Sequence, residues 1–440
     1  MKIYMPLLVI ALLSPLVLVA QNQPFSLEDC IEYALEKSTE IDRSQNKVLL
    51  QSAYLEQSQA SRLPNLQIVV NQQLTSASNY NSIDGGWDRS GNSTLNASLN
   101  SQMTLYNGAK IKNTISQNKI NLESAEKSIQ AERELMSLNV LSLYMDVLLA
   151  KENLQNSELQ LEATQQQLAY AQARREAGVI SRSDFLYIKS QLASDNTSKI
   201  EAESKVRIAL VSLMQQMNMP INDSFNIQQP DIENLIKNTP ENTPEIVYNI
   251  ALGLQPTIQT AELNVKSADV EIKIAKSGAL PSLLLNGGVG TGYSSYLNNI
   301  NLGEQMSNSL TPYVGLSLSI PIYQRKQIKT QVKTAQIQSD NVKLELQDLK
   351  NDLRKYIEQA CTDAQTAQSS YIALQEQLNA EQESYDVASE MFSQGMVNSV
   401  DFLLSKNNLM MAKNKFTQAK YTLVLQNKIV EYYSGKPITL

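Results

Sequence analysis

The chain has 440 residues, of which 37 are basic and 44 acidic, and it contains no histidine and only two cysteines. Without histidine the protein cannot run Ser-His-Asp or Cys-His nucleophilic catalysis, and it cannot build the commonest zinc sites. Catalysis by carboxylates alone remains open. The net charge of -7 and the lack of a long basic run argue against a nucleic-acid partner.

The N-terminus has the pattern of a secretory signal peptide. Lys2 precedes an almost wholly apolar run from Pro6 to Ala20, and polar residues follow from Gln21. We therefore predict a signal peptide over residues 1–20. No later stretch approaches the ~20 apolar residues that a membrane-spanning helix needs, so any membrane-spanning part must consist of strands.

Prolines and glycines reveal an internal duplication. Three pairs share one separation of 217 residues: Pro64 with Pro281, Gly178 with Gly395, and Pro220 with Pro437. A constant separation at three landmarks indicates two structural repeats. We place them at residues 21–220 and 244–437, with a linker rich in Asn and Pro over residues 219–243.

Each repeat is expected to begin with a helix that ends near its proline and to continue into two strands. The strands are predicted at about 66–75 and 94–105 in the first repeat and at about 282–293 and 312–322 in the second. Apolar residues alternate with amide-bearing or small residues in all four, as Leu66, Ile68 and Val70 alternate with Gln67 and Asn71. Strands of this kind occur in soluble β-sandwiches and in transmembrane β-barrels.

The missing charge on the polar side of these strands favours a barrel that meets lipid on its outside. Four strands are too few to close a barrel, because small transmembrane barrels begin near eight strands. Several copies of the chain must therefore pool their strands.

Long helices are predicted at about 107–177 and 324–394, because residues 109–175 and 325–394 contain neither proline nor glycine. Each would be about 100 Å long at ~1.5 Å per residue. A column of large apolar residues recurs every seven positions in the first of them, which predicts coiled-coil packing. Its members are Val140, Val147, Leu154, Leu161 and Leu168.

A tight turn follows each long helix. Gly178 and Gly395 can supply the left-handed residue that ends a helix, and Ser181 and Asn398 can cap the next one. Returning helices are expected at about 181–217 and 398–433. The chain thus forms two helical hairpins, each with a tip at its glycine.

These features together resemble the TolC family of outer-membrane efflux proteins. The resemblance rests on the duplicated plan and on motifs that recur in order: Leu63-Pro64-Asn65-Leu66 and Leu280-Pro281-Ser282-Leu283 before strands, Ser319-Ile320-Pro321-Ile322-Tyr323 after a strand, and Asp-Phe-Leu after each tip glycine. It implies a mainly α fold with β, in which four transmembrane strands per chain join in a homotrimer as a 12-stranded β-barrel above a periplasmic α-helical barrel.

The resemblance also implies a function. The trimer would be the passive exit duct of a tripartite efflux or type I secretion system, in contact with outer-membrane lipid, a periplasmic adaptor of the membrane fusion type and an inner-membrane transporter. No enzyme activity, cofactor or metal is expected. The alternative is a surface-anchored coiled-coil adhesin or a structural periplasmic spacer without transport.

Two acids are candidates for the periplasmic entrance constriction. Asp184 and Asp401 each lie six residues after a tip glycine, where family members place acids. Three copies would form a ring of negative charge. The alternative is that each Asp only stabilises the first turn of its helix. Family members also carry a further acid one turn beyond Asp401 and a basic residue two after the glycine, and here Leu404 and Val397 stand there.

The hairpin tips are the candidate adaptor contact. Family members meet their adaptor through such tips, although an ordinary solvated turn would look similar. The residues concerned are Gly178, Val179, Arg174, Arg175, Gly395, Met396 and Val397. Cys30 and Cys361 lie far apart in helical sequence, so two idle thiols are favoured over a disulfide, which the compartment would allow.

Overall fold

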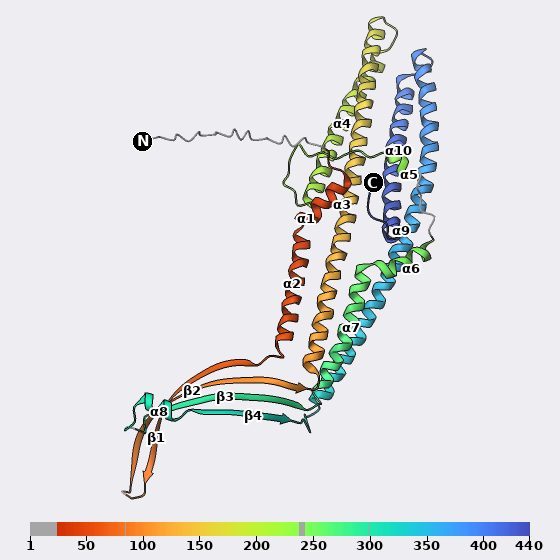
Figure 1. The fold of residues 1–440 in the computed structure, drawn as a ribbon. Helices are drawn as coiled ribbons and strands as arrows, with labels where there is room; N and C mark the ends of the chain where they lie inside the picture. Colours follow the sequence, from red (N-terminus) through yellow and green to blue (C-terminus); the bar gives the residue numbers. More distant parts are fainter. Residues whose placement is uncertain (1–23, 84, 237–242, 298) are drawn as a thin grey trace, which may run out of the picture.

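The computed structural model describes residues 24–83, 85–236, 243–297 and 299–440. The predicted signal peptide and part of the predicted linker, residues 237–242, lie outside the described residues. Four long helices form a rod, and a curved four-stranded sheet extends from one end of it (Figure 1). Among the described helices, none has the length and hydropathy required to cross a bilayer.

The helices repeat with the spacing found in the sequence. The first repeat contains α1 (Leu27–Lys37), α2 (Thr39–Ala60), α3 (Lys110–Glu176) and α4 (Arg182–Gln216). Their counterparts are α6 (Pro244–Leu254), α7 (Pro256–Ser277), α9 (Gln327–Ser393) and α10 (Ser399–Tyr433). Each helix begins and ends 217 residues before its counterpart, which confirms the duplication. The short helices α5 (Ile232–Ile236) and α8 (Leu302–Asn308) were not predicted.

The first helix of each repeat is divided in two, so the prediction of one continuous helix was wrong. Ser38 has an extended backbone and its hydroxyl accepts hydrogen bonds from the N–H groups of Glu40 and Ile41, which starts α2 afresh. Pro256 does the same for α7, because proline fits the first turn of a helix but cannot continue one.

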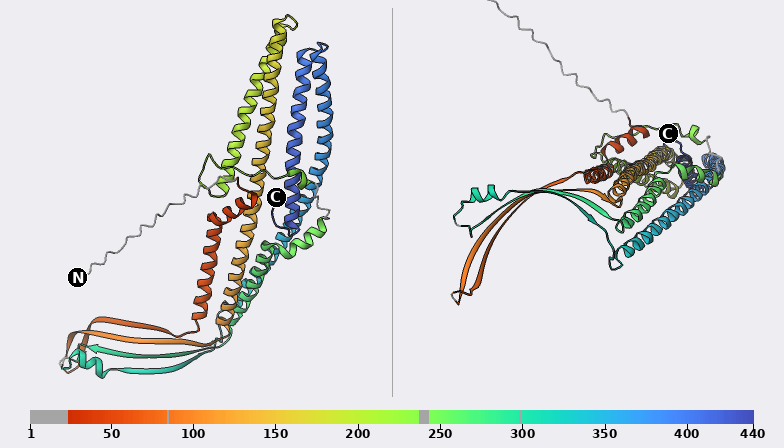
Figure 2. Two further views of the ribbon diagram at one scale, coloured as in Figure 1. Left: turned by 45° about the horizontal axis from the view of Figure 1, so that its top comes forward. Right: turned by 60° about the horizontal axis from the view of Figure 1, so that its bottom comes forward.

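The main apolar core lies midway along the rod, where α1, α3, α4 and α10 meet (Figure 2). Its largest fully buried side chain is that of Tyr144 on α3, whose hydroxyl donates to the carbonyl oxygen of Gln228 at 2.6 Å. Phe25 pairs with Ile227 beside it as a short parallel bridge. This core fixes the start of the first repeat against the segment that follows α4.

The sheet is antiparallel, with the strands in the order β1 (Asn65–Asn81), β2 (Gly86–Asn107), β3 (Ser282–Ser294) and β4 (Thr311–Ser319). Directly opposed residues share a face, and the register places Ile68 opposite Leu99, Leu99 opposite Val289 and Leu285 opposite Leu316. One face is therefore apolar across all four strands. It is bare in the single chain, since Ile68 is 72% and Val314 80% exposed.

Three of the four strands differ from the predicted ranges, whereas β3 matches its predicted range of about 282–293 to within one residue. β1 continues well past residue 75, and β2 begins well before residue 94. The polar end of β1 pairs with the polar start of β2 as far as Asn81 and Gly86, which extends both strands. β4 ends at Ser319, so Ile320 and Ile322 lie outside the strand. A bulge between Thr104 and Tyr106 shifts the register of β2 against β3.

A close approach of backbones at Gly288 yields a first test. A Cβ atom there would lie 2.5 Å from the carbonyl oxygen of Leu99, whereas one at Gly315 would meet nothing within 4 Å. We expect Gly288→Ala to destabilise the sheet by about 1–3 kcal/mol, since the strands must move apart. Gly315→Ala is the matched control and should have little effect. The measurement is guanidinium unfolding followed by the fluorescence of Trp87, the only tryptophan. Equal midpoints for the two variants would contradict this packing.

Candidate functional site: the hairpin tips

The two tips share one backbone geometry. Gly178 and Gly395 have φ angles of 75° and 77°, in the left-handed region that favours glycine. The N–H of Val179 donates to the carbonyl oxygen of Arg174 at 2.9 Å, and the N–H of Met396 donates to that of Met391 at 2.9 Å. These bonds satisfy carbonyl groups at the ends of α3 and α9, so each helix stops at its glycine.

The two candidate acids each lie in the first turn of a returning helix, beside the residue that caps it. Ser181 accepts from the N–H of Asp184 at 3.0 Å, and its hydroxyl donates to the carboxylate of Asp184 at 2.6 Å. Asn398 accepts from the N–H of Asp401 at 2.9 Å and donates to its carboxylate at 3.0 Å. Both acids therefore stabilise the first turns of α4 and α10.

Asp184 has a second partner on the other hairpin. The buried hydroxyl of Ser399 donates to the carboxylate of Asp184. The hydrogen bonds from Ser181 and Ser399 lower the pKa of Asp184, because they favour its charged form. Asp401 is exposed and makes no such bond to the first hairpin among the described residues. The two acids thus have different surroundings, although their sequence positions match.

Arg174 also joins the hairpins. Its guanidinium donates to the carbonyl oxygens of Phe392 at 3.3 Å and Ser393 at 3.4 Å, at the C-terminal end of α9. A cation is favoured there by the helix dipole. Arg175 instead lies over the ring of Phe185 within its own hairpin, 4.8 Å from the ring centroid. Of the two predicted contact arginines, Arg174 is thus engaged between the hairpins.

Each tip exposes an apolar side chain. Val179 is 61% and Met396 68% exposed, whereas Val397 is half-buried. Phe402 lies buried behind the second tip, stacked on Phe392 with ring centroids 4.7 Å apart. A stacked aromatic pair thus joins the end of α9 to the start of α10 next to the second tip.

Some residues that make contacts at this end of the rod were not predicted. Ser399 was missed because its partner, Asp184, lies on the other hairpin. Lys406 on α10 was missed for the same reason, since its ammonium group donates to the hydroxyl of Thr164 on α3. The aromatic residues Tyr385, Phe392 and Phe402 were a signal in the sequence, because they lie close to the second tip glycine on both of its helices.

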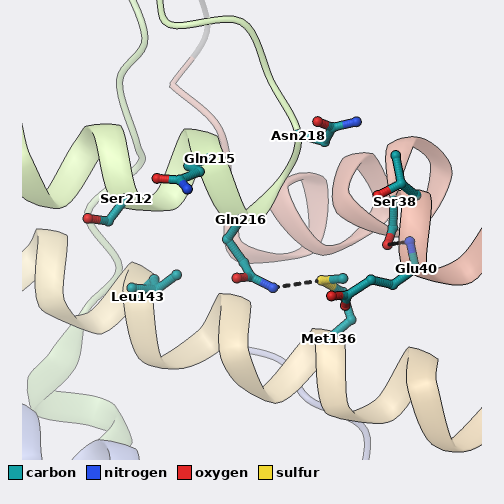
Figure 3. Close-up of a pocket in the computed structure, with 9 residues that line it drawn as sticks. Ser38, Glu40, Met136, Leu143, Ser212, Gln215, Gln216 and Asn218 are labelled. Carbon is teal, nitrogen blue, oxygen red and sulfur yellow. Dashed lines mark hydrogen bonds between the residues drawn. The ribbon is translucent and has the colours of Figure 1, made fainter.

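A separate hollow lies far from the tips, beside the central core (Figure 3). It has a volume of about 400 Å³, and Met136 and Gln216 line it, with the amide of Gln216 donating to the sulfur of Met136 at 3.0 Å. Neither cysteine forms a disulfide. Cys30 is buried in the same core, and Cys361 is half-buried. Burial raises the pKa of the Cys30 thiol to about 12.

Comparison with known proteins decides the family. The family model of outer membrane efflux proteins matches residues 30–218 and 247–429, one match in each repeat. The chain belongs to this family. The resemblance to the TolC family is thereby confirmed, and so are the outer-membrane location and the function as an exit duct in efflux.

Individual relatives are distant in sequence. The outer membrane protein TolC of Salmonella enteritidis is 25% identical over 374 residues, which cover 82% of this chain and 74% of that protein. The outer membrane efflux protein BepC of Brucella suis is 21% identical over 332 residues, covering 76% and 70%. A crystal structure of CusC matches with a TM-score of 0.81 at 18% identity, covering 94% of this chain and 92% of that one. The fold of the efflux protein family is therefore present.

The contacts of Arg174 yield a second test. Removing its guanidinium leaves the carbonyl groups of Phe392 and Ser393 without this donor, at a cost of about 1–3 kcal/mol for a charged hydrogen-bond donor. We therefore expect Arg174→Ala to speed hydrogen exchange of the last turn of α9 by about fivefold or more. Arg175→Ala is the matched control, because Arg175 contacts only its own hairpin in the described contacts. Unchanged exchange in Arg174→Ala would contradict the link between the hairpins.

Proposed function

We propose that three copies of this chain form one duct that carries cargo from an inner-membrane transporter and its periplasmic adaptor to the exterior. The observation that carries the proposal is the open four-stranded sheet. Its outer strands, β1 and β4, each pair on one side only among the described residues. Unpaired strand edges recruit further strands, and twelve strands from three chains are enough to close a barrel.

The two faces of the sheet support a barrel in lipid. The exposed apolar face would lie outward, and in β1 it runs from Leu66 to Leu74, or about 25–30 Å at ~3.3 Å per residue. This matches the apolar band of about 25 Å in such barrels. The opposite face bears uncharged side chains such as Asn96, Ser98 and Asn100, which suit a water-filled lumen.

The rod supports a periplasmic tunnel. Its tips lie at the end opposite the sheet (Figure 1). If the sheet lies in the outer membrane, α3 and α9 carry the tips about 100 Å towards the inner membrane at ~1.5 Å per residue. The adaptor would then meet the exposed side chains of Val179 and Met396, with Val397 and the backbone at Gly178 and Gly395 beside them, and Arg175 on the flank.

We assign Asp401 to the entrance constriction. Its carboxylate is exposed, and three copies in a trimer would surround the axis. Asp184 lies at the same end of the rod, and its carboxylate accepts hydrogen bonds from the hydroxyls of Ser181 and Ser399. In this proposal Asp184 contributes negative charge and also holds the two tips together.

A planar bilayer separates a duct from an adhesin or a spacer. Purified trimers should produce discrete conductance steps when reconstituted, because the lumen is continuous and wet. A trimer that opens no pore at any voltage or pH would contradict a continuous lumen through the three chains.

The entrance assignment has its own test, the block of that conductance by lanthanum ions added from the side of the tips. Asp401→Ala removes three negative charges from the ring, each worth about 1 kcal/mol towards a cation a few ångströms away in water. We expect the blocking concentration to rise about tenfold or more. Asp386→Ala removes an exposed carboxylate from the shaft of α9 and is the control. Equal block in the two variants would remove Asp401 from the constriction.

A further inference from the structure

A buried ion pair lies between the two hairpins, part-way from the tips to the central core. Lys406 on α10 is 2% exposed and Asp195 on α4 is 6% exposed. In every other ion pair of the described residues, both side chains are at least 15% exposed. Charges are seldom buried this deeply unless they are paired, so the position requires an explanation.

The pair is held through α3. The ammonium group of Lys406 donates to the hydroxyl of Thr164 at 2.6 Å and to the amide oxygen of Gln167 at 3.2 Å. The Thr164 hydroxyl in turn donates to the carboxylate of Asp195, which lies 4.0 Å from the ammonium nitrogen. The other carboxylate oxygen accepts from Gln191 at 2.8 Å.

The remaining long helix joins the same cluster. The side-chain amide of Gln167 donates to the hydroxyl of Tyr385 on α9 at 3.3 Å. We call these residues the Lys406 network: Lys406, Asp195, Thr164, Gln167, Gln191 and Tyr385. It connects α3 and α4 of the first hairpin to α9 and α10 of the second.

The charges around Lys406 are few. Asp195 on α4 supplies the opposing charge, and α3 contributes the neutral side chains of Thr164 and Gln167. Tyr385 on α9 is a titratable group that joins them through its hydrogen bond from Gln167. Burial lowers the pKa of Lys406 to about 8, and Asp195 offsets part of this effect. The charged ammonium group is therefore less stable here than in water.

A buried ion pair joins two surfaces less firmly than well-packed apolar side chains of similar size would, because both charges lose their hydration. We propose that the Lys406–Asp195 pair sets how readily the two hairpins part, and so positions the tips for opening or closing. The proposal rests on the proposed function only in taking the tips as the entrance. Lys406 acts here as a positioning residue, since it need not touch the cargo.

The direction of the pH dependence follows from hydration. When the hairpins part, Lys406 meets water and its pKa returns towards the ordinary 10.5. Parting therefore takes up a proton between about pH 8 and pH 10.5. The ratio of parted to packed hairpins should fall about tenfold from pH 7 to pH 9, and it should depend little on Lys406 well below pH 8.

The experiment measures how fast a buried thiol between the hairpins becomes reactive. Ser399→Cys places a thiol at a fully buried position, in full-length protein that also carries Cys361→Ala. Its labelling rate by a maleimide, divided by that of an exposed thiol from Val179→Cys, reports the parted fraction at each pH. Protein with neither new cysteine gives the background of the buried Cys30.

The decisive variant replaces both charges, Lys406→Met with Asp195→Leu. We expect its normalised rate at pH 7 to be about tenfold lower and to lose the decline between pH 7 and pH 9. Asp195→Leu alone leaves Lys406 unpaired and should raise the rate. The control is Lys199→Gln with Glu203→Gln, an ion pair on the surface of α4, which should leave the rate unchanged.

A double variant with the wild-type rate and the wild-type pH dependence would overturn the proposal, as would a wild-type rate that does not change with pH. The assay needs no conductance. Failure of the duct in bilayers and failure of the Lys406 network are therefore separate results.

Discussion

The structure depends on the backbone hydrogen bonds at the edges of one small sheet. Within the part of one chain that the structure describes, β1 and β4 each leave one row of N–H and C=O groups without a strand partner. In lipid such groups cost several kcal/mol each, so only a closed arrangement of strands is stable there. The apolar face of the same sheet is bare as well, with Ile68 and Val314 largely exposed. Together the edges and the face explain why this chain belongs to an outer-membrane assembly.

The helices meet a different constraint, because they must stay straight over a long span and still part at one end. Apolar packing near Tyr144 and Val140 fixes the middle of the rod. Towards the tips the contacts between the hairpins become polar, through Glu152 with Lys420, the Lys406 network, and Arg174 with the end of α9. Polar contacts exchange with water at little net cost, so the rod is held more firmly at its middle than at its tips.

The repeat, the long helices and the tips could be predicted because local residues determine them. Gly178 and Gly395 end their helices by their own backbone geometry, and the 217-residue spacing needs no knowledge of packing. The division at Ser38 was missed because a serine cap inside an apolar pattern resembles an ordinary surface residue. The lengths of β1 and β2 were missed because their polar ends lack alternation and are held only by pairing with each other.

The candidate site was harder to predict for a similar reason. Asp184 and Asp401 occupy matching positions in the two repeats. Among the described contacts, however, only Asp184 accepts a hydrogen bond from the other hairpin, because this bond from Ser399 depends on how the two hairpins are aligned. The same alignment places Arg174 against α9 and Lys406 against Thr164. A single sequence shows the periodicity of each helix but not the axial register between two hairpins. Contacts between the hairpins therefore had to come from the structure.

The edges of β1 and β4 are satisfied only when several chains share one sheet. Native mass spectrometry of the full-length protein, released from detergent micelles, counts the chains in the particle directly. We expect a particle of three chains that persists on dilution, because twelve strands close the barrel and no edge remains. A stable particle of one or two chains with the sheet intact would contradict it.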